Sequence, residues 1–247
     1  MFSGDSIRDT FFRFRYHLRN RIGHFPSVYF PLYNLIHPRT PHCTSRKSDI
    51  VIEGFPRSAN SFAVTAFAMV QKKPMRIAHH RHLPAQIIAA VKYCVPAIVL
   101  VRNPKDAVSS FLAYNRYLRI DEALRGYVYF YDTIDSYRDH FVVAPFDVVV
   151  SEFDRVIRKV NEVFTTSFEE FVPTEENMKK CREMIKKYYR ERVDSKEYES
   201  QVAVPSQARE KLKSVFLEDF SSSQILSIRS QAEDIYSKFI SYSLFDN

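Results

Sequence analysis

The pattern of apolar and polar positions alternates between two kinds of segment along most of the chain. Short β-branched or apolar runs, typical of strands, occur at 49–53, 74–78, 96–101 and 141–146. Longer segments with apolar side chains at helical spacing occur between and after them, at 62–70, 84–93, 121–139, 152–164 and 174–190, with further helices expected from Pro104, Ser206 and Ser223 and a loop at 194–206. This order predicts an α/β protein with three layers, in which a mostly parallel central sheet has helices on both faces.

The first 47 residues depart from this alternation. Apolar side chains recur at helical spacing near the start, at Ile7, Phe11, Phe14, Leu18 and Ile22. Arginines fill much of the remaining surface, so a basic amphipathic helix is predicted over 7–22. Two interpretations follow: the helix packs on the domain, which we favour, or it makes peripheral contact with anionic lipid headgroups. Prolines among aromatic residues at 25–44 predict an irregular segment that covers part of a site.

Composition narrows the class of protein. A chain of 247 residues with 45% hydrophobic residues is expected to form a single domain over 1–247. The formal charge of +7 favours anionic ligands. The three cysteines have no spacing typical of a zinc site, and no apolar run reaches the roughly 18–20 residues of a membrane span. Without a recognisable signal peptide, the expected location is the cytoplasm.

The stretch SDIVIEGFPRSANSF at 48–62 predicts a strand, a tight loop and a helix start. Gly54 and Pro56 end the strand, and small or hydroxylated residues lead into the helix. Such a loop presents unpaired N–H groups and the positive end of the helix dipole, which together bind anions. The Lys-Ser/Thr pair of nucleotide triphosphate loops is absent. The alternative is an ordinary turn with a serine cap.

Three histidines, His79, His80 and His82, follow the second expected strand. The carboxyl ends of parallel strands share one edge of a sheet, so this cluster should face the 58–61 loop across a crevice. No metal is expected, because only His80 and His82 share one side of an extended segment and no carboxylate or cysteine is near. A structural role for these histidines remains the alternative.

Arg102 is the first polar residue after the apolar run at 96–101. Asn103 is suited to cap the next helix, and Pro104 is suited to its first position. Ser110 then lies two turns further along the face of that helix that is next to Arg102. An arginine and a hydroxyl at this distance can hold a phosphate by charge-assisted hydrogen bonds. An ion pair between Arg102 and Asp106 is the alternative.

Taken together, these segments resemble the sulfotransferases that use 3′-phosphoadenosine-5′-phosphosulfate (PAPS). The sequence PRSANSF at 56–62 is similar to that family's P-K/R-S-G-T-T-W loop, which cradles the 5′-phosphosulfate. The sequence RNPKD at 102–106, with Ser110, is similar to the family's 3′-phosphate motif. The sequence HRHLP at 80–84 is similar to K-T-H-L-P and aligns His82 with the catalytic base. The likeness covers about residues 48 to 165.

The resemblance implies a P-loop-like sulfotransferase fold and a PAPS-dependent transferase that needs no metal. It implies transfer of the sulfuryl group to a hydroxyl or amine of a saccharide, lipid headgroup or small molecule, with adenosine 3′,5′-bisphosphate (PAP) as product. The implied catalytic residues are His82, Arg57 and His80. The implied nucleotide contacts are Arg57, Ser58, Ala59, Asn60, Ser61, Phe62, Arg102, Ser110, Phe146 and Arg209.

The chain also departs from the family pattern. Ala59 replaces a glycine, Asn60 replaces a threonine, and His80 stands where relatives have a lysine. The base therefore remains open between His82 and His80, with His82 favoured; an imidazole of ordinary pKa, about 6.5, is neutral enough to accept a proton. A carboxyl-terminal glycine-rich motif of the animal enzymes is missing, and Arg209 is the nearest substitute.

Two other functions remain open from the residues alone. A small-molecule kinase with a P-loop is disfavoured by the missing Lys-Ser/Thr pair. A non-enzymatic basic protein that binds phosphate groups or a membrane is also disfavoured, and a nucleic-acid partner is not expected. The acceptor of a transferase, a glycan or small molecule, is not specified by the sequence. Aromatic residues at 25–33 and 127–131 either wall an acceptor pocket or form core.

Overall fold

Four parallel strands form the centre of the computed structural model, which describes residues 7–37, 42–193, 198–202, 204, 215–217 and 219–245. The strands are β1 (Ile50–Gly54), β2 (Ile77–His79), β3 (Ala97–Val101) and β4 (Val142–Pro145), in the spatial order β2-β1-β3-β4. Every pair is parallel, as the alternating pattern predicted. The middle strands are fully buried because both of their faces are covered.

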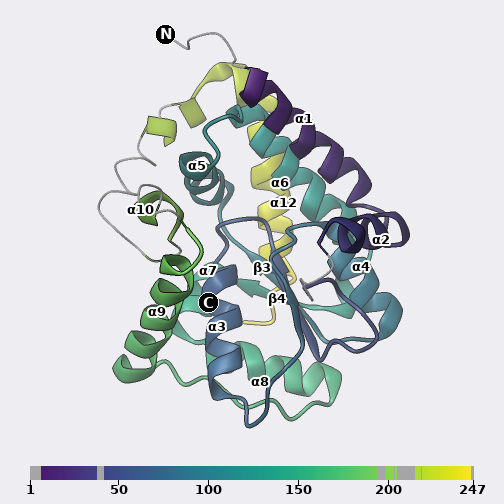
Figure 1. The fold of residues 1–247 in the computed structure, drawn as a ribbon, viewed down its shortest axis with the longest axis vertical. Coiled ribbons are helices and arrows are strands. Elements are labelled where there is room, and N and C mark those ends of the chain that lie inside the picture. The colour runs from purple at the N-terminus through teal and green to yellow at the C-terminus, as the bar shows by residue number, and fades with distance from the viewer. Residues whose placement is uncertain are drawn as a thin grey trace.

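Helices cover both faces of the sheet, which confirms the three-layer prediction (Figure 1). Their bounds are α3 (Asn60–Val70), α4 (Pro84–Tyr93), α5 (Pro104–Tyr114), α6 (Ile120–Asp135), α7 (Phe146–Ser151), α8 (Phe153–Phe164), α9 (Glu175–Arg190), α10 (Tyr198–Gln201) and α12 (Leu226–Ser241), with short 3-10 helices at Arg138–His140 and Ser223–Ile225. Side chains from α4, α5, α6 and α12 pack on one face, and those from α3, α7, α8 and α9 pack on the other.

Alternation along each strand divides the core into these two halves. In β1, Val51 contributes to the half under α6, whereas Ile50 and Ile52 contribute to the half under α3. In β3, Val99 and Leu100 divide in the same way. Successive side chains of a strand point to opposite faces, so each strand supplies both layers of helices.

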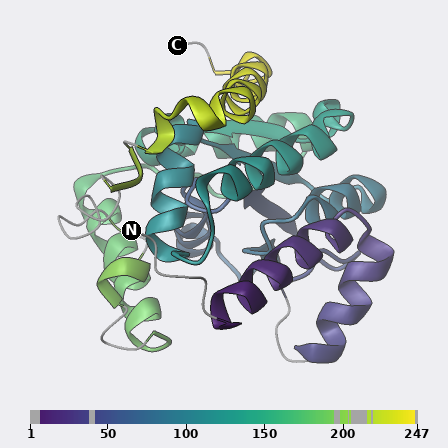
Figure 2. The same ribbon diagram turned by 90° about the horizontal axis from the view of Figure 1, so that it is seen from above.

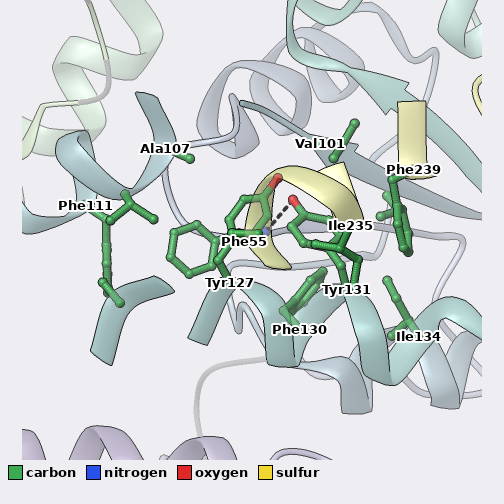
Figure 3. Packing of buried hydrophobic residues seen from close by; sticks show 14 of the residues in the cluster. Phe55, Val101, Ala107, Phe111, Tyr127, Phe130, Tyr131, Ile134, Ile235 and Phe239 are labelled. Carbon is green, nitrogen blue, oxygen red and sulfur yellow. Dashed lines mark hydrogen bonds between the residues drawn. The ribbon is translucent and has the colours of Figure 1, made fainter. Parts of the chain in front are cut away.

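Two tyrosines of α6 tie the strand ends together within the first half of the core (Figure 3). The Tyr131 hydroxyl donates to the carbonyl of Leu100 at 2.8 Å and accepts from the N–H of Phe55 at 3.3 Å. The Tyr127 hydroxyl donates to the carbonyl of Arg102 at 2.7 Å. These bonds hold the carboxyl ends of β1 and β3 in register where the expected site begins.

The amino-terminal segment forms two helices, α1 (Ile7–Ile22) and α2 (Pro26–Ile36), which lie together at one edge of the molecule in both views (Figure 1, Figure 2). The bounds of α1 are those predicted. The prediction of an irregular segment over 25–44 is wrong for its first part, which is α2. Pro26 occupies the first helical position, where no N–H bond is needed. Tyr29 and Phe30 pack on α4, and this burial offsets the backbone hydrogen bond that Pro31 cannot make.

Other differences are local. The segment predicted as one helix over 121–139 ends at Asp135 and is followed by a 3-10 turn. Val163, expected to face inward, is 44% exposed. The loop predicted at 194–206 contains α10, and Ser206, the expected start of the next helix, lies outside the described residues. None of the helices in the described part of the chain combines the length and apolar character needed to cross a bilayer.

Candidate functional site

A cavity of about 530 Å³ lies at the carboxyl ends of β1, β2 and β3. Its walls bring together the three segments that the sequence singled out, although they are far apart in the chain. The expected residues that line it are Arg57, Ala59, Asn60, Ser61, Phe62, His80, His82, Arg102, Ser110 and Phe146. Ser58 lies beneath the lining and is fully buried, and Arg209 is outside the described residues.

The loop between β1 and α3 has an unusual backbone. Arg57 and Ala59 have positive φ angles of 72° and 70°, the left-handed region that favours glycine. Ala59 is the residue before α3, where no side chain caps the helix. The first backbone hydrogen bond of α3 runs from the N–H of Ala63 to the carbonyl of Ala59. The N–H groups at 59–62 come before this bond, so they have no backbone acceptor within the helix. These donors and the helix dipole form a place for an anion beside the cavity.

Two arginines add positive charge to this loop. The Arg102 guanidinium donates to the carbonyl of Arg57 at 2.9 Å and lies 4.0 Å above the ring centre of Phe146. The Arg57 guanidinium donates to the Ser110 hydroxyl at 3.2 Å and to the carbonyl of Gln201 at 3.3 Å. Arg57, Arg102 and Ser110 therefore form one connected group at the cavity wall, and Asn103 caps α5 as predicted.

His82 is held by the strand that precedes the anion loop. Its Nδ1 lies 2.8 Å from the carbonyl of Gly54. A carbonyl only accepts, so Nδ1 carries the hydrogen and Nε2 keeps its lone pair for the cavity that His82 lines. Burial, followed by the neighbouring His80, lowers the pKa of His82 well below its ordinary value of 6.5. The imidazole is therefore neutral, with Nε2 unprotonated.

His80 is bound at both ring nitrogens. Its Nε2 lies 3.0 Å from the Ser61 hydroxyl, and its Nδ1 contacts Nδ1 of His79. Burial, then the charges of His42 and Arg81, lower the pKa of His80 to about 4. With both nitrogens engaged, His80 is less available than His82 to take a proton from a substrate, and it connects the second loop to the first.

Glu53 was missed in the sequence analysis. Its carboxyl group is fully buried in β1 and accepts from the N–H of Arg81 at 2.6 Å and from that of His82 at 3.1 Å. Burial raises the pKa of Glu53 to about 7, against the hydrogen bonds from Arg81 and His82, which lower it. The signal in the sequence was a carboxylate inside the apolar run IVIEG, a position that few charged residues occupy without partners.

Several further cavity residues come from segments that the sequence did not connect with the site. Tyr189, near the end of α9, has its hydroxyl 3.3 Å from that of Ser61. Tyr16 and Arg19 of α1 also line the cavity, as does Tyr117. Of the aromatic residues at 127–131, Tyr127, Phe130 and Tyr131 are core, so the acceptor-wall alternative is wrong for these three.

The donors present are suited to a phosphate or phosphosulfate group. Positive side chains and open N–H groups face the cavity, and none of the described residues that line it is Asp or Glu. Within the described part of the chain, no group of three or more histidines, cysteines or carboxylates is placed to hold a metal ion. The cavity therefore offers anion binding and a neutral imidazole within one space.

No family model matches the chain, and no curated protein matches it. One solved structure that matches is a crystal structure of the mouse sulfotransferase SULT7A1 complexed with PAP. The sequences are 14% identical, the match covers 76% of this chain and 90% of that chain, and the TM-score is 0.42. A likeness at this level carries no argument about activity.

Proposed function

We propose that this protein is a sulfotransferase that moves the sulfuryl group of PAPS to a hydroxyl or amine acceptor, a saccharide, lipid headgroup or other small molecule. One observation carries the proposal: the three segments that resemble the PAPS motifs line a single cavity, to which they bring Arg57, Arg102 and the neutral imidazole of His82, and no described lining residue is a carboxylate.

Each group has a proposed role. The N–H groups at 59–62 and the Arg57 guanidinium bind the 5′-phosphosulfate, and Arg57 stabilises negative charge that develops on the leaving phosphate. Arg102 and Ser110 bind the 3′-phosphate, because a guanidinium and a hydroxyl together make charge-assisted hydrogen bonds. Phe146, whose ring centre lies 4.0 Å from the Arg102 guanidinium, is proposed to contact the adenosine.

His82 is the proposed general base. PAPS supplies the sulfuryl group, whose bond to the phosphate breaks as the acceptor oxygen or nitrogen bonds to sulfur. Nε2 of His82 accepts the proton that the acceptor loses, and the carbonyl of Gly54 keeps the ring in the tautomer that this role requires. His80 is proposed to orient Ser61 and to line the phosphosulfate end, because both of its nitrogens already have partners.

The test of the activity is direct. The purified full chain is incubated with labelled PAPS and a panel of sugars, lipid headgroups, phenols and amines, and with labelled ATP in parallel. Transfer of label from PAPS supports the proposal. Transfer from ATP, with none from PAPS, would identify a kinase and contradict it.

Nucleotide binding tests the site without a known acceptor. Calorimetry should show that PAP binds much more tightly than adenosine 5′-phosphate, and Arg102→Ala should remove most of the difference, about 1.5–3 kcal/mol for a lost charged hydrogen bond. Arg158→Ala is the control, because this exposed arginine pairs with Glu170 and neither residue lines the cavity. Equal affinities of the unmodified protein for the two nucleotides would refute the 3′-phosphate site.

A further inference from the structure

The apolar stripe that defines α1 in the sequence faces away from the protein. Ile7 is 92% exposed and Phe14 is 62% exposed, and Phe11 and Leu18 are exposed as well. These four residues recur every three or four positions, so they form one line along the helix. An isolated exposed apolar residue needs no explanation, but a continuous line of four along one helix marks an interaction surface.

The packing of α1 explains why the stripe is left outside. Tyr16, on the opposite side of the helix, is buried against α6, where its hydroxyl occupies the space that a Cβ at Gly126 would need. Phe12 contacts Tyr117, with ring centres 5.2 Å apart. Since Tyr16 and Phe12 attach the helix to the domain, the stripe is not needed for attachment.

A second apolar line lies on α2, the neighbouring helix at the same edge of the molecule (Figure 2). Tyr29 and Phe30 bury one side of α2 against α4. The exposed apolar side chains of α2 and the residue before it are Phe25, Val28, Leu32, Leu35 and Ile36. We call the exposed apolar residues of the two helices, together with Arg8, Arg15 and Arg21, the α1–α2 face.

The charges on this face have one sign. Arg8, Arg15 and Arg21 are exposed, and no ion pair joins any of them to another described residue. By contrast, Arg13 pairs with Glu122 at 3.1 Å. Within residues 7–37 the sequence has a single acidic residue, Asp9. Arginines beside an apolar stripe are typical of helices that lie in a membrane interface, where long side chains reach the headgroups while apolar groups insert.

From these contacts we infer that the α1–α2 face docks on the surface of an anionic lipid bilayer, with the two helices lying in the interface. A second copy of the chain fits the face less well, because a symmetric contact would oppose arginines to arginines. A nucleic acid would pair with the arginines but would leave the phenylalanine and leucine side chains in water. A bilayer with anionic headgroups satisfies both features.

The geometry also relates this face to the cavity. Tyr16 and Arg19 line the cavity from the inner side of α1, so a docked α1 would separate the bilayer from the cavity by the width of one helix. The docking inference does not depend on the proposed sulfuryl transfer, because it is measured as binding to vesicles without substrate.

The experiment measures sedimentation of the full chain with phosphatidylcholine vesicles that either contain or lack phosphatidylserine, at low and high salt. We expect binding that requires phosphatidylserine and weakens with salt. The triple variant Phe11→Ser, Phe14→Ser and Leu18→Ser should lower the partition coefficient about tenfold or more. The triple variant Arg8→Gln, Arg15→Gln and Arg21→Gln should lower it roughly fivefold per charge at low salt.

The control is the double variant Val172→Ser and Leu226→Ser, which removes apolar residues of similar exposure, 53% and 54%, from elsewhere on the surface. It should bind vesicles as the unmodified protein does. Thermal unfolding of every variant shows whether it is folded. If the serine variant does not fold, the arginine variant alone tests the inference. Three results would overturn the inference: no binding to either vesicle, equal binding by all variants, or a lipid-free dimer that the serine substitutions dissociate while vesicles leave the protein in solution.

Discussion

Two loops meet at the cavity, and they differ in whether their backbone N–H groups have hydrogen-bond acceptors within the protein. Both contain residues with positive φ angles: Arg57 and Ala59 in the loop after β1, and His80 and His82 in the loop after β2. In the second loop, the carboxyl group of Glu53 accepts the N–H groups that this conformation exposes. In the first loop, the N–H groups at 59–62 have no such acceptor among the described residues.

The N–H groups of one loop are therefore bonded within the protein, whereas those of the other are available to a ligand. The histidine loop is completed by a carboxyl group from the sheet, so the position of His82 is set before any substrate binds. The loop before α3 is completed only when an anion from outside accepts its hydrogen bonds. We therefore expect a change at His82 to alter turnover and changes to the anion loop to alter affinity.

The largest expected effect concerns His82. His82→Asn should lower turnover with PAPS about 10²-fold or more, while the affinity for PAP stays nearly unchanged, because a general base acts on the acceptor proton. Since the pKa of His82 lies well below 6.5, its ionisation should add no rise in turnover near that pH, in contrast to a histidine with an ordinary pKa.

Steady-state kinetics at saturating PAPS provide the measurement, with His140→Asn as the control from a surface turn. His80→Asn should instead weaken nucleotide binding. Near-full turnover of His82→Asn, with loss in His80→Asn, would move the base to His80.

Glu53 should give the next largest effect, seen in the pH dependence of stability. The pKa of Glu53 is raised from 4.5 to about 7 in the folded protein, so between these pH values the folded state keeps a proton that the unfolded chain has released. Stability from this group is complete below 4.5 and is lost as the pH rises through about 7. Glu53→Gln cannot titrate at this position. As the pH rises over this range, the free energy of unfolding of Glu53→Gln should therefore increase relative to that of the unmodified protein, by on the order of 3 kcal/mol.

Urea unfolding at several pH values measures that change, and Glu122→Gln provides a contrast. Burial opposes ionisation of Glu122, but bonds from Arg119, His17 and Arg13 outweigh it and lower its pKa. Glu122→Gln should therefore be less stable than the unmodified protein at neutral pH, and this difference in the free energy of unfolding should shrink as the pH falls through and below 4.5. A difference between Glu53→Gln and the unmodified protein that stays constant with pH would contradict a raised pKa for Glu53.

Amide hydrogen exchange should separate the two loops directly. The N–H groups of Arg81 and His82 should be protected without ligand, because Glu53 accepts from both. The N–H groups at 59–62 should exchange rapidly and slow by about tenfold or more when PAP binds. Equal protection of the two loops without ligand would remove the distinction between them.

The smallest expected effect comes from backbone strain. Ala59 has a φ angle of 70°, which costs alanine but not glycine, so Ala59→Gly should stabilise the protein by about 0.5–1 kcal/mol. The matched control is Ala66→Gly in the interior of α3, where the same substitution should destabilise by about 1 kcal/mol or more. Thermal unfolding of the two variants should therefore give shifts of opposite sign; a loss of stability in Ala59→Gly would contradict strain at this position.

Much of the fold and of the candidate site could be predicted from the sequence, because the relevant signals are local. Strand and helix periods identified the four strands and the order of the main helices, and residues that follow a strand had to lie at the shared carboxyl edge. For this reason Arg57, His82 and Arg102 could be expected to meet although the chain separates them widely. The cap at Asn103 and the bounds of α1 also follow from adjacent residues.

Only the tertiary structure decided which surfaces are covered. Periodicity identified the apolar stripe of α1, but whether that stripe faces the core depends on Tyr16 and Gly126, which are far apart in the sequence. The same holds for Glu53, whose partners lie in the loop after the next strand, and for Tyr189, which reaches Ser61 from α9. The local sequence specifies the chemical type and spacing of the side chains. Their burial and hydrogen bonding depend on which distant segment packs against them.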